Sequence, residues 1–268
     1  MKKYTYYILY SMLCLLVAGC ESIAEDDRYI ELPAVEQKRN VLLEEFTGQD
    51  CLNCPDAHRA IEALKEQYGE ALVSVSIHAG DFAVAEGTKP YPTFKTPEGD
   101  LYNDMWGIKS WPAGVVNRTS GVEQHAAWGA SIRAELERPT TTDIDLTATL
   151  TEDNHISVTT TVSTPVDENA KLQLWVIENG LVSLQRDGSK IVPQYVHNHV
   201  YRASINGVGG EPLFDYTAPG IVSEKTLSHS IAVKDTWTPG NLRIVAFVYT
   251  TEGVQQVVET ALASAIDN

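Results

Sequence analysis

Two cysteines separated by two residues, Cys51 and Cys54, are the residues whose types and spacing are best suited to chemistry. Before them, residues 41–46 form a short apolar run that is long enough for one buried strand. After them, the apolar residues of 54–68 recur at the three- and four-residue spacing of a helix face, and Pro55 is tolerated in a first helical turn. The pattern predicts a strand, a turn and a helix that begins at the C-x-x-C pair.

A helix N-terminus changes the chemistry of a cysteine. Its unpaired amide groups and the positive end of the helix dipole stabilise a thiolate, which is the nucleophilic form. We therefore predict that Cys51 is the exposed nucleophile and that Cys54, one turn deeper, is the resolving thiol. Asp50 acts in the opposite direction, because a neighbouring carboxylate disfavours a thiolate. Cys51 is expected to be a moderately activated nucleophile.

The order of these features resembles the thioredoxin-like superfamily, in which a strand, C-x-x-C, a helix and a second strand are followed by a proline in cis. The second strand would be 71–78, and Trp111–Pro112 would be the cis peptide bond. The resemblance implies an α/β thioredoxin-like domain. It also gives Glu45, six residues before Cys51, the role of a buried carboxylate that helps to move the proton of the resolving thiol.

Two differences from the thioredoxin pattern bear on the redox potential rather than on the fold. Asp50 stands where an aromatic residue is usual, and Leu52–Asn53 replaces Gly-Pro between the cysteines. We predict that Asp50, Trp106 and Trp111 contact the substrate. The backbone beside Pro112 is expected to pair with an extended substrate segment, which gives Pro112 a part in catalysis.

The first residues of the chain have the features of a targeting segment. Two lysines precede an apolar run at 6–17 that is too short to span a bilayer comfortably. Val17-Ala-Gly-Cys20 resembles the lipobox of bacterial lipoproteins, which implies that residues 1–19 are a signal peptide and that Cys20 carries acyl chains such as palmitate. The alternatives are an ordinary cleaved signal with a chance cysteine, or an uncleaved anchor.

Processing at this site would change both the thiols and the charge. Cys14 would leave with the signal and Cys20 would become a thioether, so that the C-x-x-C pair would hold the remaining thiols. The formal net charge is −16, and removing two lysines and no acidic residue takes it to −18. Such acidity argues against nucleic acid as a partner and against electrostatic adhesion to an anionic membrane surface. We predict that lipid anchors the protein and that residues 20–39 are a polar tether.

The length of the chain suggests two domains, because roughly 250 mature residues exceed one thioredoxin-like unit. We place the first domain at 40–138, ending with a helix around 125–137 that Pro139 stops. Extra sequence at about 80–106 is predicted to be an inserted loop. It is either a functional lid beside the reactive pair or a cap over the sheet edge.

After residue 140 the sequence changes to the two-residue alternation of β-strands. The predicted strands are 144–150, 156–162, 171–178, 196–205, 225–233, 242–250 and 254–263. Short strands without a helical period favour an all-β, immunoglobulin-like sandwich at 139–268.

Seven histidines raise the question of a metal. His197 and His199 would lie on one face of the predicted strand 196–205, but a zinc site needs three or four ligands, so we interpret them as structural. His58 falls on the cysteine-bearing face of the predicted helix, where it would either tune the thiols or complete a Cys-Cys-His metal set. We favour the first, because a fourth ligand is missing, and we predict no metal and no cofactor.

Over its length the chain resembles the outer-membrane-protein-28-related lipoproteins of Bacteroidota. The lipobox, E-E-F-T-G-x-x-C-x-x-C-P, W-P-A-G-V-V-N-R and H-N-H-V-Y-R carry that resemblance. It implies a thioredoxin-like domain with an appended β domain, held by lipid at the outer membrane on its periplasmic or cell-surface face.

These features lead to one main hypothesis and two alternatives. The main hypothesis is an envelope-anchored thiol–disulfide oxidoreductase with a redox-active centre that acts on thiols or disulfides of protein substrates. The first alternative is a surface or periplasmic binding lipoprotein in which Cys51–Cys54 is only a structural disulfide. The second is a metal-binding chaperone that uses Cys51, Cys54 and His58.

Overall fold

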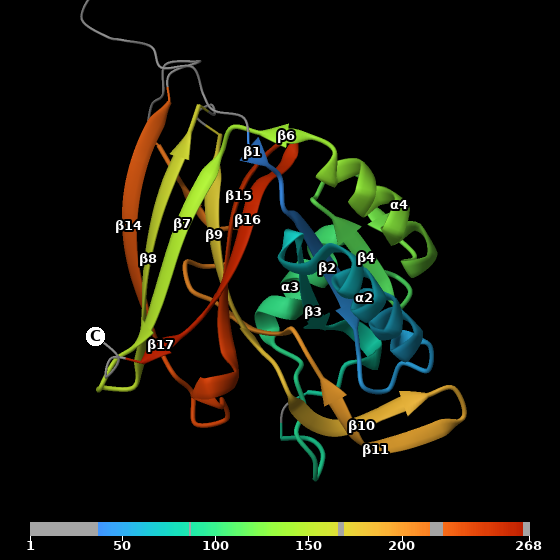
Figure 1. The fold of residues 1–268 in the computed structure, drawn as a ribbon. Helices are drawn as coiled ribbons and strands as arrows, with labels where there is room; N and C mark the ends of the chain where they lie inside the picture. Colours follow the sequence, from blue (N-terminus) through green and yellow to red (C-terminus); the bar gives the residue numbers. More distant parts are fainter. Residues whose placement is uncertain (1–36, 86, 166–168, 215–221, 265–268) are drawn as a thin grey trace, which may run out of the picture. The chain divides into compact units, whose positions relative to one another are not determined.

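The computed structural model describes residues 37–85, 87–165, 169–214 and 222–264 (Figure 1). The predicted signal peptide, Cys20 and the tether up to residue 36 lie outside the described residues. All described residues belong to one compact unit, Ala34–Asn268. No helix among them is long and apolar enough to cross a lipid bilayer.

The C-x-x-C pair lies between a buried strand and a helix, as the sequence predicted. Every residue of β2 (Val41–Thr47) is buried, and so is every residue of β3 (Leu72–His78), which runs parallel to β2. Between these strands, α2 (Cys54–Tyr68) begins at the second cysteine with Pro55 in its first turn. β4 (Ala113–Val116) continues the sheet antiparallel to β2. The strand and helix predictions are therefore confirmed.

The remaining elements of residues 37–140 are short or lie on the faces of this sheet. They are β1 (Gln37–Lys38), η2 (Gly69–Ala71), η3 (Gly80–Phe82), α3 (Pro97–Trp106), β5 (Val122–Glu123), α4 (His125–Leu136) and β6 (Pro139–Thr140). The Trp111–Pro112 peptide bond before β4 is cis, as predicted.

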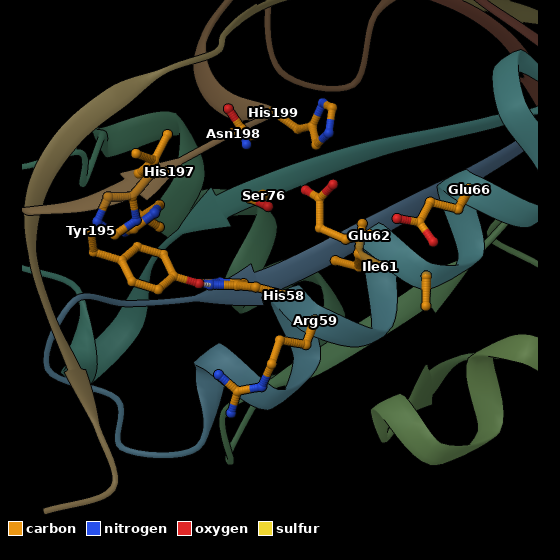
Figure 2. A pocket seen from close by; sticks show the side chains of 13 residues that line it. His58, Arg59, Ile61, Glu62, Glu66, Ser76, Tyr195, His197, Asn198 and His199 are labelled. Atoms are coloured by element: carbon orange, nitrogen blue, oxygen red, sulfur yellow. Dashed lines mark hydrogen bonds between the residues drawn. The ribbon is translucent and has the colours of Figure 1, made fainter. Parts of the chain in front are cut away.

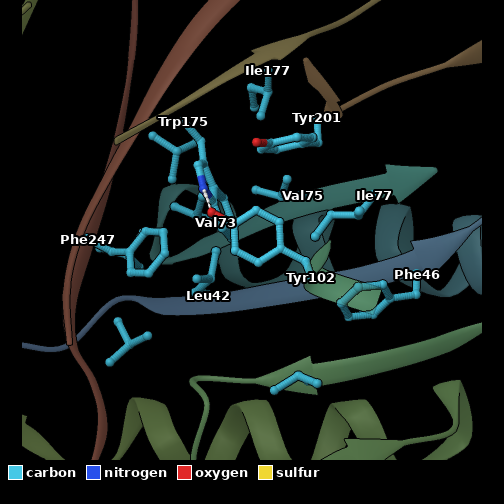
Figure 3. Close-up of a cluster of buried hydrophobic side chains, with 14 of the residues drawn as sticks. Leu42, Phe46, Val73, Val75, Ile77, Tyr102, Trp175, Ile177, Tyr201 and Phe247 are labelled. Atoms are coloured by element: carbon cyan, nitrogen blue, oxygen red, sulfur yellow. Dashed lines mark hydrogen bonds between the residues drawn. The ribbon is translucent and has the colours of Figure 1, made fainter. Parts of the chain in front are cut away.

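The two faces of the β2–β3–β4 sheet are covered by different parts of the chain. On one face, α2 and α4 pack against the strands through a cluster that includes Ile61, Trp128 and Ile132. The other face carries the cluster shown in Figure 3, in which Leu42 and Val73 of the strands meet aromatic residues from beyond residue 140. These aromatic residues are Trp175, Tyr201 and Phe247.

The later strands are β7 (Asp143–Leu150), β8 (His155–Thr164), β9 (Lys171–Glu178), β10 (Leu181–Asp187), β11 (Lys190–His197), β12 (Val200–Ser204), β13 (Glu211–Pro212), β14 (Ser223–Ala232), β15 (Leu242–Thr250), β16 (Gly253–Ala261) and β17 (Ala263–Ser264). A 3-10 turn, η4 (Pro239–Asn241), precedes β15.

Strands from both sides of residue 139 share one sheet. Its order is β16-β15-β9-β12-β3-β2-β4-β5, and the junction is the parallel pairing of β12 with β3, where Val200 lies opposite Ser76. A second sheet, β14-β8-β7-β17, packs against the β9–β15 part through an apolar cluster. A division at residue 139 into independently folding domains stays a prediction, but strand pairing is continuous across it.

One predicted strand was wrong. The segment 196–205 is divided, because β11 ends at His197, β12 begins at Val200, and His199 between them has φ +57°. His197 and His199 therefore do not share one strand face. The unpredicted strand β10 pairs with β11 in a two-stranded sheet of its own, which we call the covering hairpin (residues 181–197).

The predicted inserted loop at 80–106 is partly a cap. Its helix α3 places Tyr102 in the apolar cluster of Figure 3 with no exposed surface, and the Tyr102 hydroxyl accepts a hydrogen bond from Trp175 Nε1 at 2.9 Å. Phe94 is also buried. These residues join the core and do not form a free lid.

Candidate functional site

The cysteine pair forms a disulfide that has almost no contact with solvent. Cys51 and Cys54 are bonded, and their exposed fractions are 2% and 0%. Between them, Leu52 is 46% exposed. The prediction that Cys51 is exposed was therefore wrong, because other parts of the chain cover it.

The covering hairpin closes one side of the pair. It forms hydrogen bonds with the backbone of residues 48–53, between β2 and α2, which we call the cysteine loop. Arg186 N donates to the carbonyl of Gln49 at 2.9 Å, and Gly188 N donates to the carbonyl of Leu52 at 2.8 Å. The buried side chain of Gln185 donates from Nε2 to the carbonyl of Cys51 at 3.0 Å and to that of Gly48 at 3.2 Å. Four carbonyl groups within residues 48–52 are thus bonded by one hairpin.

Side chains strengthen the same contact. Arg186 Nε lies 3.1 Å from Asp50 Oδ1, and the Gln49 amide donates to Ser183 Oγ at 2.9 Å. Asp50 was predicted to contact substrate, and in this structure its carboxylate is engaged by Arg186. Ser183 and Gln185 both face the cysteine loop because alternate residues of a strand share a face.

Residues 80–82 press against the cysteine loop as well. Asp50 N donates to the carbonyl of Phe82 at 3.0 Å. Gly48 permits this approach, because a Cβ on it would lie 2.3 Å from the Phe82 carbonyl carbon and oxygen. Phe82 also meets the ring of Trp111 at a centroid distance of 5.5 Å.

The remaining predicted substrate residues lie near the cis peptide bond. The ring of Trp111 packs over Gly80. A Cβ added to Gly80 would lie 2.1 Å from that ring, and Gly80 also has φ +71°. Pro112 is buried. Because the next residue, Ala113, pairs with Phe46, Pro112 lies beside the end of β2, where the cysteine loop begins. Trp106 is partly buried against the Figure 3 cluster. The substrate roles of Trp106 and Trp111 and the catalytic role of Pro112 stay predictions.

Glu45 is a buried carboxylate, as the resemblance implied. Its side chain has no exposed surface, and Ser76 Oγ donates to its Oε2 at 2.6 Å. Its Oε1 lies 3.2 Å from His58 Nε2. His58 is one helical turn after Cys54 on α2, so Glu45 lies on the face of the sheet that the cysteine-bearing helix covers.

His58 links this carboxylate to the covering hairpin. Its Nε2 also lies 3.0 Å from Thr47 Oγ1, and its Nδ1 lies 2.8 Å from the hydroxyl of Tyr195 on β11. Burial, reinforced by the charge of Glu45, raises the pKa of Tyr195 to about 12. Figure 2 shows the Tyr195 hydroxyl turned toward the His58 ring across the gap between β11 and α2. Tyr195 thus keeps its proton throughout the range in which thiols titrate.

A cavity of about 340 Å³ opens beside this contact and is lined by His58, Glu62, Tyr195 and three further histidines (Figure 2). Burial lowers the pKa of His197 to about 3 and that of His78 well below its ordinary value, so both rings are neutral at pH 7. Among the residues that the structure describes, no group of three or more His, Cys, Asp or Glu is arranged to hold a metal ion.

Comparison with known families relates this chain to one of them. The family model for outer membrane protein Omp28 matches residues 99–265. The chain belongs to the Omp28 family. Membership confirms the predicted location at the outer membrane of the cell envelope and the resemblance to outer-membrane-protein-28-related proteins. Acylation of Cys20 stays a prediction.

Of two solved structures, that of HBP35 is similar to this chain in fold. HBP35 of Porphyromonas gingivalis is 19% identical with a TM-score of 0.66, covering 84% of this chain and 76% of that chain. A domain of the outer membrane lipoprotein Omp28 from the same organism is 22% identical with a TM-score of 0.33, covering 46% of this chain and 96% of that chain. No curated protein matches the sequence significantly.

Sequence reasoning missed the covering hairpin, and with it Gln185 and Tyr195. A signal for the hairpin was present. The apolar runs of β10 and β11 are separated by Gly188 and Ser189, and a two-residue Gly-Ser connection is typical of a tight hairpin turn. That signal does not indicate where the hairpin docks. The hairpin's partners in the cysteine loop are distant in sequence, and Gln185 and Cys51 are 134 positions apart.

Proposed function

We propose that this Omp28-family protein is a thiol–disulfide oxidoreductase of the outer membrane. In this proposal residues 40–138 are a thioredoxin-like unit, and 139–268 are an immunoglobulin-like β-sandwich that supplies the cover. The parallel β2–β3 pair, the C-x-x-C at the start of α2 and the cis peptide bond before β4 support it. Its substrates are thiols or disulfides of envelope proteins.

The buried carboxylate of Glu45 carries the proposal. A carboxylate without exposure loses its hydration, which is unfavourable unless strong partners replace the water. Within the described residues, no lysine or arginine forms an ion pair with it, and the nitrogen near its Oε1 is His58 Nε2 at 3.2 Å. A disulfide that only staples a loop does not require such a group, whereas a resolving thiol requires a base that takes its proton.

The proposed reaction uses three groups. The Cys51 thiolate attacks a substrate disulfide, so that a mixed disulfide forms and one substrate sulfur leaves as a thiolate. Cys54 then gives its proton to Glu45 and attacks the Cys51 sulfur. The second substrate sulfur leaves, and the pair is left oxidised while the substrate disulfide has gained two electrons. The reverse sequence oxidises a substrate dithiol. In either direction the covering hairpin must move for Cys51 to meet a substrate.

Trapping of the mixed disulfide tests this function. In Cys54→Ser the attack proceeds but resolution cannot, so we expect discrete adducts with envelope proteins on a non-reducing gel of cells that produce the full chain. Cys51→Ser is the matched control and should give few adducts or none. Empty lanes for both variants, together with no reduction of a model protein disulfide by the wild type, would contradict the proposal.

A structural disulfide in a binding lipoprotein is the second candidate. The 2% exposure of Cys51 is the observation that favours it. Under this reading both serine variants leave gels empty and lower stability by up to a few kcal/mol for the lost crosslink. The gel described above therefore separates the two candidates.

Anchoring through Cys20 completes the proposal. Because Val17-Ala-Gly precedes this cysteine, we expect Cys20→Ala to move the protein from the membrane fraction to the soluble fraction. Fractionation with immunodetection measures the change, and Cys14→Ala is the control, since Cys14 lies before the cleavage site. Full membrane retention of Cys20→Ala, with no acyl mass on the wild-type N-terminus, would show that lipid at Cys20 is not the anchor.

A further inference from the structure

We propose that the covering hairpin occupies the place of the substrate, and that the site takes an extended protein segment with a lysine or arginine beside its reactive cysteine. The inference rests on the proposed function and deepens it, because it names the class of substrate. A substrate that reaches Cys51 must displace this hairpin, since the hairpin bonds the backbone on both sides of that cysteine.

The hairpin bonds the cysteine loop in the way that an added strand bonds the edge of a sheet. The amides of Arg186 and Gly188 donate to the carbonyls of Gln49 and Leu52. These two amides are two positions apart, so both leave the same edge of the chain. Any extended segment presents amides at this spacing, whatever its side chains are. An extended substrate can therefore make the same two bonds.

The hairpin contributes nothing to the apolar core. It forms a separate two-stranded sheet beside α2 (Figure 1), and the three apolar clusters of the described residues contain none of residues 181–197. Its apolar residues Val182, Ile191 and Val196 are exposed. The rings of Tyr195 and His197, hydrogen bonds and ion pairs hold it against the rest of the chain. The hairpin can therefore leave without removing a side chain from these clusters.

The side chain that the hairpin presents to Asp50 is cationic. Arg186 Nε lies 3.1 Å from Asp50 Oδ1, and the two side chains are 46% and 37% exposed. Displacement of the hairpin removes this cation. The cysteine loop and the first turns of α2 then hold two carboxylates against one guanidinium, those of Asp50, Asp56 and Arg59. The uncovered loop is thus anionic, in a chain with a formal net charge of −16, and a substrate cation can take the position of the Arg186 guanidinium.

Reduction of the Cys51–Cys54 disulfide by model peptides tests the inference in the full chain. Three synthetic dithiol peptides differ in the residues beside their cysteines, which are arginine, glutamine or glutamate. One peptide thiolate attacks Cys51, and Cys54 leaves as a thiolate. The second peptide thiol then attacks the bonded peptide sulfur and releases Cys51, so that the protein pair gains two electrons and the peptide becomes a disulfide.

We expect the arginine peptide to reduce the pair about fivefold faster than the glutamate peptide, with the glutamine peptide between them, the upper scale of an exposed ion pair. The ratio should approach one at about 1 M salt, where the screening length is about 3 Å. In Asp50→Asn the preference should also disappear. The readout is the ratio of the arginine and glutamate rates, because the intrinsic reactivity of each peptide is the same in every variant.

Two further variants separate selection by Asp50 from opening of the cover. Arg186→Gln breaks the same ion pair but keeps Asp50, so it should speed all three peptides and preserve the preference for arginine. Asp143→Asn is the matched control, because it removes an exposed carboxylate of β7 in the second sheet. It should change neither the rates nor their ratio.

Equal ratios in the wild type and Asp50→Asn, or loss of the preference in Arg186→Gln or Asp143→Asn, would overturn the inference while leaving the oxidoreductase intact. A disulfide that none of the three peptides reduces, together with empty gel lanes for Cys54→Ser, would overturn the proposed function, and the inference with it.

Discussion

Replacing Arg118 with methionine should lower the free energy of unfolding by about 3–5 kcal/mol, the range found when one partner of a buried ion pair is removed. Arg118 makes two bonds to Glu44, at 2.6 Å from Nε and 3.1 Å from Nη2. Glu44 has no exposed surface, so the variant leaves a buried carboxylate without its cation. Urea denaturation followed by circular dichroism measures the change.

The guanidinium of Arg118 also lies over aromatic rings from the second half of the chain. Its central carbon is 4.8 Å from the ring centroid of Phe247 and 4.7 Å from that of Tyr249. Glu44 belongs to β2 and the rings belong to β15. We therefore expect the loss of Arg118 to destabilise the strands on both sides of residue 139. We expect one cooperative transition at a lower urea concentration.

Two further variants make this result specific. Arg133→Met removes an exposed arginine of α4 and should change stability by less than about 0.5 kcal/mol. The double variant Glu44→Gln with Arg118→Met removes the charge on both sides and should recover part of the loss. A cost below about 1 kcal/mol for Arg118→Met would mean that the Glu44 carboxylate finds other partners.

Much of the first half of the fold could be predicted from local patterns. The helix from Cys54 to Tyr68 has its predicted bounds, because the apolar spacing and Pro55 are both features of the segment itself. The strand that carries Glu45 was equally clear, since its apolar run is short and continuous. The sequence alone offers no such pattern for the parallel pairing of Val200 with Ser76, which joins segments that are distant in the chain.

The same distinction explains the error at the site. A helix N-terminus indicates an activated cysteine, and this inference is local. Exposure of that cysteine is not a local property, because it depends on whether another segment covers it. Here Gln185 and Arg186 supply the cover. The role of Glu45 came from a resemblance, and the contact of His58 with Tyr195 could not be found without the docking of the hairpin.

Replacing Gln185 with leucine should raise the rate at which a small dithiol reduces the Cys51–Cys54 disulfide by about tenfold or more. The Gln185 side chain is buried and donates to the carbonyls of Gly48 and Cys51. Leucine is of similar size but cannot donate. The Gly48 carbonyl keeps its hydrogen bond from Cys51 N, whereas the Cys51 carbonyl loses the bond from Gln185, and a buried carbonyl left without a partner costs about 1–3 kcal/mol. In the open hairpin water bonds these carbonyls, so the variant destabilises the closed state alone. A shift of ~1.4 kcal/mol is a tenfold change in the open population.

Reduction is measured by quenching samples with an alkylating reagent and counting modified cysteines by mass spectrometry. Gln256→Leu is the control, because Gln256 is also buried, donates to the carbonyl of Lys38, and lies outside the cover. Equal acceleration in both variants would mean that global unfolding exposes the pair. No acceleration in Gln185→Leu would mean that reagents reach Cys51 by a path that does not involve the hairpin. Acceleration confined to Gln185→Leu would make opening of the hairpin the step that admits a substrate, because a reductant can attack Cys51 only after the carbonyls of its own loop are released.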